Sequence, residues 1–166
     1  NVEIKDTNIR GIPKIPGHWE KCRIKYLFSE IIGGSWGDDP KNDNPESLVK
    51  VIRVTEFNMK KLKINDDIPT LRSFVISGLQ KKLIRRNDLI LEKSGGGEKT
   101  PVGRIVSVDK EIKSPIINSN FTCLCRPIVS INSRFLVYAL NNFYNVGKTK
   151  RNIKQTTGIQ NLDVDS

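Results

Sequence analysis

Apolar and polar residues alternate on both sides of a glycine-rich stretch near the middle of the chain. An apolar run from Leu89 to Leu91 precedes the triple glycine Gly95 to Gly97, and alternating apolar positions follow from Val102 to Val108. This order predicts a strand, a loop and a strand. Because glycine has no side chain and tolerates positive φ, such a loop can press its main chain against another surface. A flexible connector is the alternative interpretation of the same residues.

Shorter patterns predict three more strands. They are expected over Leu48 to Thr55, over Leu62 to Ile68, where the pattern is weakest, and over Asn118 to Arg126. In the last of these, alternation places three side chains on one strand face: Phe121, Cys123 and Cys125.

Helical spacing of apolar residues occurs in two places. Arg23 to Ile32 has this spacing, and the glycine pair after it would end a helix. Ser133 to Asn145 follows a candidate cap, Asn132 or Ser133 itself, which predicts a helix packed on the core. Its apolar stripe consists of Leu136, Ala139, Leu140 and Phe143. Residues Phe74 to Arg86 fit a short helix or a turn. Strands with a few packing helices predict an α+β fold.

The beginning of the chain lacks a strong pattern. Residues 1–10 are polar and are expected to form a linker or an N-terminal arm, so the domain is expected to span residues 11–166. Two prolines before Trp19 favour an extended path, and Trp19 is expected to pack as an anchor. Ser35 to Pro45 is dense in Gly, Pro, Asn and Asp, which predicts an exposed loop. Trp36 within it would be a lid over the core or a contact residue.

Composition points to a polyanionic partner. The 166 residues suit one domain with a hydrophobic core, and the formal charge of +10 is typical of proteins that bind nucleic acid. Acidic residues are concentrated between Asp38 and Asp67, whereas none occurs from Ile112 to Leu162. This segregation favours one basic face over an evenly charged surface.

Cysteine and histidine are too few and too scattered for a disulfide framework or a zinc site. Cys22 is far from Cys123 and Cys125, and His18 is the single histidine, so reduced, buried thiols are expected and neither metal nor cofactor is predicted. No apolar run has membrane-spanning length and the polar start is unlike a signal peptide. A cytoplasmic protein without membrane contact is therefore expected.

The candidate DNA-binding residues fall in the glycine-rich loop and in the acid-free segment from Gly147 to Leu162. They are Lys93, Ser94, Gly95, Gly96, Gly97, Glu98, Lys99, Thr100, Arg104, Lys148, Lys150, Arg151, Lys154, Gln155 and Thr156. Lysines and arginines of the second segment suit phosphates, while Asn152, Gln155 and Thr156 can pair with base edges. The alternative for that segment is a solvated tail. An ATP-binding loop is rejected because Glu98 precedes Lys99 and a strand-like pattern follows.

Several short motifs follow one another along nearly the whole chain. They are Ile15-Pro16-Gly17-His18-Trp19, Gly33-Gly34-Ser35-Trp36-Gly37, Arg53-Val54-Thr55, Asn87-Asp88-Leu89-Ile90, Ser94-Gly95-Gly96-Gly97, Val102-Gly103-Arg104 and Thr157-Gly158-Ile159-Gln160-Asn161-Leu162. Their order resembles the target recognition domain of the specificity (S) subunit of Type I restriction-modification systems. Each motif alone has little specificity, whereas their order is fairly specific.

The resemblance implies a compact domain with a strongly twisted, mostly antiparallel β region and no chemistry of its own. It implies that the domain recognises one half of a bipartite double-stranded DNA target and directs methyltransferase (M) and motor-nuclease (R) subunits. The long conserved helix of the family is absent after Ser166, which suggests an excised domain or a half-subunit. A second recognition domain or a homodimer would then supply the other half.

Two other functions fit part of the sequence. An RNA-binding module would need stacking aromatics beside the basic segment, where only Phe143 and Tyr144 lie. A metal-dependent nuclease is suggested faintly by Asp88 and Glu92 with Lys93, although an Asp also suits a turn before a strand. A methyltransferase is not expected, because its cofactor loop and its Asn- or Asp-Pro-Pro-aromatic motif are missing.

Overall fold

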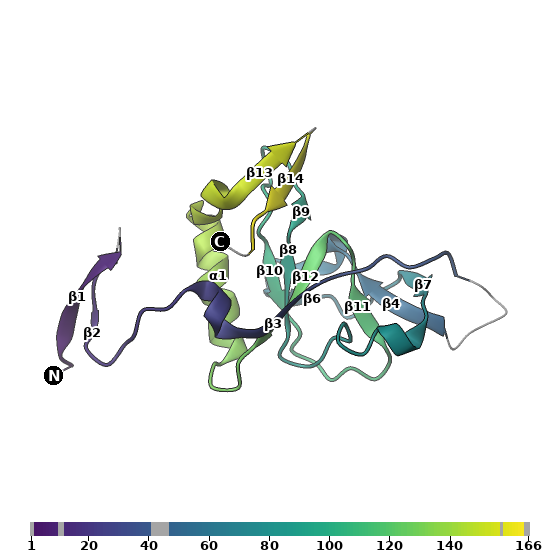
Figure 1. Cartoon of the computed structure of the whole chain (residues 1–166), viewed down its shortest axis with the longest axis horizontal. Coiled ribbons are helices and arrows are strands. Elements are labelled where there is room, and N and C mark those ends of the chain that lie inside the picture. The colour runs from purple at the N-terminus through teal and green to yellow at the C-terminus, as the bar shows by residue number, and fades with distance from the viewer. Residues whose placement is uncertain (1, 10–11, 41–46, 157, 165–166) are drawn as a thin grey trace.

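A six-stranded sheet forms the centre of the molecule. The computed structural model describes residues 2–9, 12–40, 47–156 and 158–164 (Figure 1). The strands of the central sheet lie in the order β3-β12-β8-β10-β6-β5, and all pairs are antiparallel except β10 with β6. Their bounds are β3 Phe28–Gly33, β5 Phe57–Asn58, β6 Lys63–Ile64, β8 Leu89–Glu92, β10 Ile105–Ser107 and β12 Thr122–Pro127.

Both faces of this sheet are covered, which explains why apolar residues follow one another in its strands. In β8, Leu89 packs into the core cluster that contains Leu136 and Val137, while Ile90 packs into the cluster on the opposite face. Consecutive strand residues point to opposite faces, so a sheet buried on both sides needs apolar residues without alternation. The same division holds in β12 for Cys123 and Leu124.

Helix α1, Ser133–Asn145, covers one of these faces (Figure 1). Its bounds agree with the predicted helix, and the Asn132 side chain caps it by accepting a hydrogen bond from the Phe135 amide at 3.0 Å. Leu136 and Val137 are buried against β8, β10 and β12, and Leu140 packs beside them. The predicted stripe is therefore the core face at Leu136 and Leu140.

Two smaller sheets complete the body. One has the order β11-β4-β7, with β11 (Ile116–Asn118) parallel to β4 (Leu48–Ile52) and β7 (Leu71–Ser73) antiparallel to it. The other has the order β13-β14-β9 and joins β13 (Ile153–Thr156) and β14 (Ile159–Leu162) to β9 (Ser94–Gly95). Together with the 3₁₀ turn Lys148–Asn152, this last sheet forms what we call the C-terminal lobe, at the top of Figure 1.

The structure is thus a single, mostly β domain with mainly antiparallel sheets, and α1 is the one α-helix among the described residues. The rest of the helical content is 3₁₀ turns at Ile24–Leu27, Val54–Glu56, Ile76–Gly78 and Lys148–Asn152. The predicted fold class is confirmed. In the described part of the chain, no helix is both long and apolar enough to cross a membrane.

The first residues form a hairpin of β1 (Ile4–Ile9) and β2 (Ile12–Pro16) that stands apart from the body in Figure 1. The expected polar arm therefore contains a strand, and the expected boundary at residue 10 separates two paired strands. Trp19, expected to be a packing anchor, is 52% exposed. It follows a hairpin with no core beneath it, so there is nothing for its ring to pack into. Cys22, expected to be buried, is exposed for the same reason.

The predicted helix over Arg23 to Ile32 is wrong. The structure has the turn Ile24–Leu27 and then β3, which pairs with β12 along its length. Ile31 and Ile32 pack on opposite faces of the central sheet, and their β-branched side chains favour a strand. Because neighbouring apolar residues of this strand pack into two different core clusters, their spacing in the sequence resembled that of a helix.

Other strand predictions were only partly right. The strand over Leu48 to Thr55 is confirmed as far as Ile52, but that over Leu62 to Ile68 shrinks to β6. Leu62 has a φ of 52°, which no strand residue adopts. Phe121 does not share the strand face of Cys123 and Cys125, because it lies 44% exposed in the turn between β11 and β12.

Candidate nucleic-acid interface

Four loops and turns surround a hollow of about 460 Å³ below the C-terminal lobe. We call it the glycine-loop hollow. It is lined by Trp36, Arg53, Val54, Thr55, Glu92, Ser94, Gly95, Gly96, Arg104, Ser119, Asn120 and Phe121. These residues come from distant parts of the sequence, and the fold brings them together.

The glycine loop is held from the C-terminal lobe. β9 pairs with β14 at Ser94 and Gly95, and the Ser94 hydroxyl lies 2.6 Å from the Asn161 Oδ1. The Gln160 side chain is buried, and its Oε1 accepts a hydrogen bond from the Val102 amide at 3.2 Å. The loop is therefore an ordered strand partner, and the flexible-connector interpretation does not apply to Ser94 and Gly95.

Gly96 has a conformation that requires glycine. Its φ is +60°, and a Cβ on it would lie 2.8 Å from the Val102 nitrogen and 3.1 Å from Gln160 Oε1. A Cβ on Gly97 would meet nothing within 4 Å. The three glycines therefore have different roles, and Gly96 is the one that keeps the loop against Gln160.

The opposite wall is the segment after β3. Gly34 packs so closely on the turn after β11 that a Cβ would lie 2.0 Å from the Ser119 carbonyl oxygen. Trp36 is held by Arg72, whose guanidinium lies 4.9 Å from the ring centre and whose Nε donates to the Trp36 carbonyl at 3.3 Å. Trp36 is 38% exposed and is fixed in the wall of the hollow by Arg72. This favours the interpretation of Trp36 as a contact residue over that of a lid.

Arg104, the residue before β10, enters the hollow and is bound by Glu92. Its Nε and Nη2 donate to the two carboxylate oxygens of Glu92, each at 2.8 Å, and Glu92 is 1% exposed. The hydrogen bonds to Glu92 raise the pKa of Arg104, against the lowering effect of burial. A bidentate pair of this kind fixes the plane of the guanidinium.

Arg53 has the same arrangement with Glu56, on the other side of the hollow. Its Nη2 donates to Glu56 Oε1 at 2.9 Å, and its main-chain amide donates to Oε2 at 2.7 Å. Burial alone would raise the pKa of Glu56, but hydrogen bonds from Arg53 and Thr55 outweigh it and lower the pKa. Glu56 is 4% exposed, so a buried carboxylate again holds a partly exposed arginine.

The floor of the hollow is the turn between β11 and β12. The Thr122 amide donates to the Ser119 carbonyl at 3.0 Å, which closes the turn and leaves the Asn120 and Phe121 side chains exposed. The buried Ser119 hydroxyl has no hydrogen-bond partner among the described residues. The hollow thus brings together two aromatic rings, an amide and two guanidinium groups.

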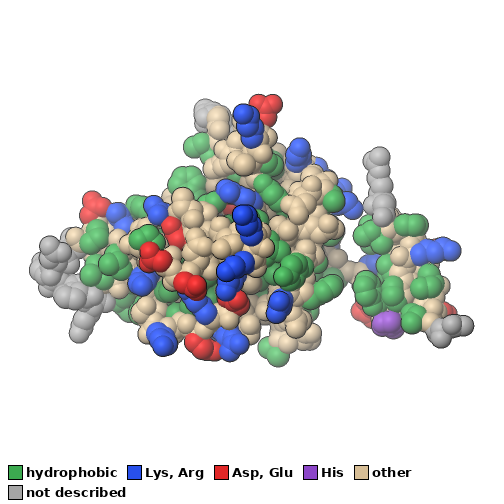
Figure 2. Space-filling model, turned by 180° about the vertical axis from the view of Figure 1, so that it is seen from behind, with side chains coloured by type: hydrophobic (Ala, Val, Ile, Leu, Met, Phe, Trp, Pro, Cys, Tyr) green, Lys and Arg blue, Asp and Glu red, His purple; other side chains and the backbone are tan. Residues whose placement is uncertain are grey.

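Most of the basic residues predicted from the acid-free segment surround the C-terminal lobe. Lys150 and Arg151 are exposed in its 3₁₀ turn, and Lys148 lies with its Nζ 5.4 Å from the centre of the Phe143 ring. Lys154 is exposed but pairs with Asp163 at 2.9 Å. Seen from behind, several Lys and Arg side chains lie along the middle of the molecule below this lobe, and the left side shows Asp and Glu side chains mixed with Lys and Arg (Figure 2). The segment is folded, so the solvated-tail interpretation fails.

The structure brings only part of the predicted site together. Ser94, Gly95, Gly96 and Arg104 line the hollow, while Gly97 lies beside them and Glu98, Lys99 and Thr100 form an exposed tip closed by the Gly97 amide donating to the Thr100 carbonyl at 3.0 Å. Lys93 is half-buried, and Gln155 is exposed on β13. Thr156 belongs to β13, but its side chain lies outside what the structure describes.

Sequence reasoning missed Arg53, Glu56, Asn120 and the supporting residue Gln160 as parts of the site. Glu92 and Arg104 lie side by side just beyond the β8–β10 register, with the Glu92 amide donating to the Arg104 carbonyl at 2.8 Å, and the strand–loop–strand prediction gave the signal for that pairing. The three-residue spacing of Arg53 and Glu56 indicates an ion pair only if the residues form a helical turn. The sequence predicted a strand as far as Thr55, so this pair was not expected.

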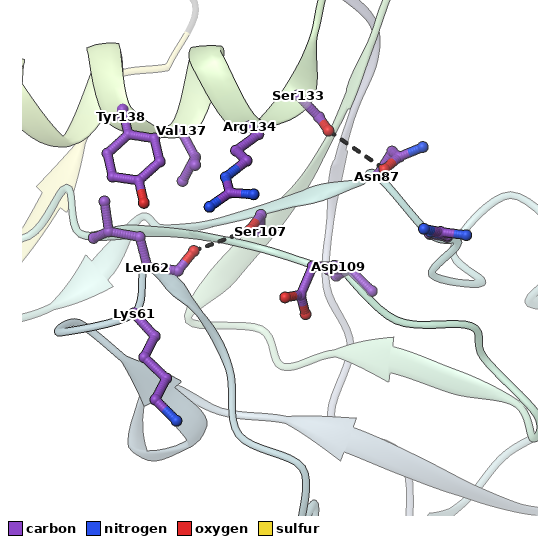
Figure 3. A pocket seen from close by; sticks show the side chains of 11 residues that line it. Lys61, Leu62, Asn87, Ser107, Asp109, Ser133, Arg134, Val137 and Tyr138 are labelled. Atoms are coloured by element: carbon purple, nitrogen blue, oxygen red, sulfur yellow. Dashed lines mark hydrogen bonds between the residues drawn. The ribbon is translucent and has the colours of Figure 1, made fainter.

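A second hollow of about 340 Å³ lies at the first turn of α1 and contains Arg134, Tyr138 and Lys61 (Figure 3). We call it the helix hollow. In Figure 3 the Ser133 hydroxyl points to Asn87, 3.4 Å away. Arg86, also in its lining, pairs with the exposed Glu111. The lysine and arginines that line the helix hollow are exposed to solvent, whereas each arginine of the glycine-loop hollow is paired with a buried glutamate.

The carboxylates that suggested a nuclease are bound to arginine. Arg126 Nε and Nη2 each donate to Asp88 at 3.0 Å, and Arg104 occupies both oxygens of Glu92. Asp88 also accepts from the Arg85 amide at 2.7 Å, as the turn before β8 requires. Within the described ranges, no three acidic, histidine or cysteine side chains lie together as a metal site would need. Both carboxylates therefore have structural partners.

No protein-family model matches the chain, and no curated protein is significantly similar to it. A functional assignment therefore depends on the geometry of the glycine-loop hollow and of the C-terminal lobe.

Proposed function

We propose that this chain is a sequence-specific double-stranded DNA-binding domain, the target recognition domain of a Type I restriction-modification specificity subunit. One observation carries the proposal. Three segments that resemble that family, at Gly33 to Gly37, at Arg53 to Thr55 and at Ser94 to Gly97, are far apart in sequence and meet around the glycine-loop hollow.

The charge distribution supports the same function. The hollow adjoins the C-terminal lobe through β9 and β14, and that lobe exposes Lys150 and Arg151. Exposed cations beside a hollow with polar side chains suit a duplex whose phosphates are neutralised while a base edge is recognised. In this proposal the domain recognises one half of a bipartite target, and methyltransferase and motor-nuclease subunits perform the chemistry in the cytoplasm.

RNA binding is a second candidate because the structure brings together two aromatic side chains that are far apart in the sequence. Trp36 and Phe121 are partly exposed at the same hollow, and unpaired bases stack on such rings. The duplex proposal is favoured because the Trp36 ring is already in contact with Arg72.

The test is selection from a pool of random DNA duplexes by the purified chain, followed by binding to the selected duplex, a scrambled duplex and a structured RNA. We expect a short consensus, preference for the selected duplex over both competitors, and affinity that falls steeply with salt. Equal binding to all duplexes, or preference for the RNA, would overturn the proposal. Turnover of DNA or of a methyl donor by the chain would overturn the non-enzymatic assignment.

A further inference from the structure

Two arginines line the glycine-loop hollow, and a buried glutamate holds each of them. Arg53 and Arg104 both belong to its lining, and their side chains are 40% and 25% exposed. The side chains of their partners, Glu56 and Glu92, are 5% and 2% exposed. An exposed arginine on a surface normally has a mobile head group, but these two cannot leave their buried carboxylates without leaving those charges unpaired.

The donors that remain free are the same in both arginines. Nε and Nη2 are used on the glutamate in each case, and no described residue accepts a hydrogen bond from either Nη1. What faces away from the glutamate is the end of the guanidinium, with Nη1–H and the second Nη2–H side by side. Two parallel donors at a fixed spacing match two adjacent acceptors.

The two arginine–glutamate pairs differ from phosphate-binding lysines and arginines in their net charge. Each glutamate offsets the charge of its arginine, so Arg53 and Arg104 add little to the attraction of a polyanion. Their donors are instead held at a fixed angle, next to Gly95 and Gly96, which add no side-chain bulk. Held donors with offset charge suit a neutral acceptor pair within a groove.

We infer that Arg53 and Arg104 are the base-recognition residues of the site and that each binds the N7 and O6 acceptors of a guanine from the major-groove side. Glu56 and Glu92 are positioning residues that hold the guanidinium planes. This inference depends on the proposed duplex-binding function. Guanine is the base that presents two adjacent acceptors in the major groove, and arginine is its commonest specific partner.

The experiment starts from the consensus selected by the wild-type chain, in which each of the two arginines should require one guanine. Replacing that guanine by 7-deazaguanine removes N7 and should weaken binding about 5- to 150-fold, whereas inosine keeps N7 and O6 and should bind nearly as well. Arg53→Gln and Arg104→Gln should each lose the preference for guanine at one position. Their salt dependence should equal that of the wild type.

The matched control is Lys150→Ala, which should weaken binding to all duplexes and lower the salt dependence while leaving the consensus unchanged. The double variant Glu92→Gln with Arg104→Gln removes the buried charge together with its partner, so it separates loss of recognition from loss of folding, checked by thermal unfolding. Glu56→Gln should reduce discrimination, and it should not lower the salt dependence as Lys150→Ala does, because Arg53 keeps its charge.

The outcomes distinguish this inference from the function on which it depends. A consensus without guanine, normal binding of 7-deazaguanine, or arginine variants that keep the wild-type consensus would overturn the role of Arg53 and Arg104 alone. Arginine variants that lower the salt dependence as Lys150→Ala does would make them phosphate contacts. Absence of any duplex binding would overturn both proposals.

Discussion

The glycine-loop hollow and the C-terminal lobe carry the same kind of charge in opposite surroundings. In the hollow, Arg53 and Arg104 are each held by a glutamate that is almost fully buried. On the lobe, Lys150 and Arg151 are exposed on a short 3₁₀ turn. A held cation gives direction to its hydrogen bonds, whereas an exposed one gives long-range attraction that salt screens. The comparison separates specificity from affinity within one basic protein.

The largest effect should come from breaking a held pair. Glu92→Ala leaves the Arg104 guanidinium without its partner, and we expect a loss of about 3 kcal/mol in unfolding free energy, near the low end for buried pairs because Arg104 keeps some solvent contact. Urea unfolding measures it. The matched control is Glu98→Ala at the exposed loop tip, which should change stability by less than about 0.5 kcal/mol. Equal effects would show that the pair does not hold Arg104.

The glycine loop should show a smaller effect, confined to one position. Gly96→Val forces a β-branched residue to a φ of +60° against Val102 and Gln160, and we expect a loss of about 1–3 kcal/mol in stability together with weakened DNA binding. Gly97→Val is the control, because no atom lies within 4 Å of its Cβ position. If both variants behave alike, the contact with Gln160 does not set the path of the loop.

The exposed lobe should respond mainly in its salt dependence. In the proposed duplex complex Lys150 contacts a phosphate, so Lys150→Ala should lower the slope of log affinity against log salt by about one unit while stability stays unchanged. Titrations at several salt concentrations check this. Lys154→Ala should have the weaker effect of the two, because Asp163 already offsets its charge at 2.9 Å. A larger change in slope for Lys154→Ala would contradict the comparison.

The smallest effect should be in the acid range. The folded-state pKa of Glu56 is lowered, so this carboxylate stabilises the fold above its ordinary pKa, and the contribution disappears as the pH falls through the folded value. Glu56→Gln should therefore cost about 1 kcal/mol near neutral pH and give a flatter dependence of stability on pH below about pH 4.5. Thermal unfolding from pH 7 to pH 3 measures it, and parallel curves for both proteins would refute the assignment.

How far the sequence predicted this structure depended on the range of the interactions. The helix Ser133–Asn145 and its cap depend on neighbouring residues, so the helix was predicted correctly and Asn132 was one of the two candidate caps. β3 was mistaken for a helix, because its two successive isoleucines pack on opposite faces of a sheet that distant strands complete. Local spacing cannot show which face a later strand will cover.

The candidate site shows the same division. The glycine loop was found because three glycines stand together, and the basic segment was found from its lack of acids. Arg53 and Glu56 were missed, since they meet only in the 3₁₀ turn Val54–Glu56, and Phe121 was placed in a strand when it lies in a turn. What the sequence could not supply was the meeting of these segments in space.

The pairing of β9 with β14 also has a consequence for folding during synthesis on the ribosome. The Gly96 turn rests on Gln160, and β9 has no neighbour in its small sheet except β14. The central sheet and α1 can form while the chain is still being synthesised. The last strand of that sheet ends at Pro127, and the helix ends at Asn145. The glycine loop must wait for the residues around Gln160 to emerge. Synthesis from the N-terminus therefore allows the central sheet and α1 to form before β9 acquires its partner strand β14.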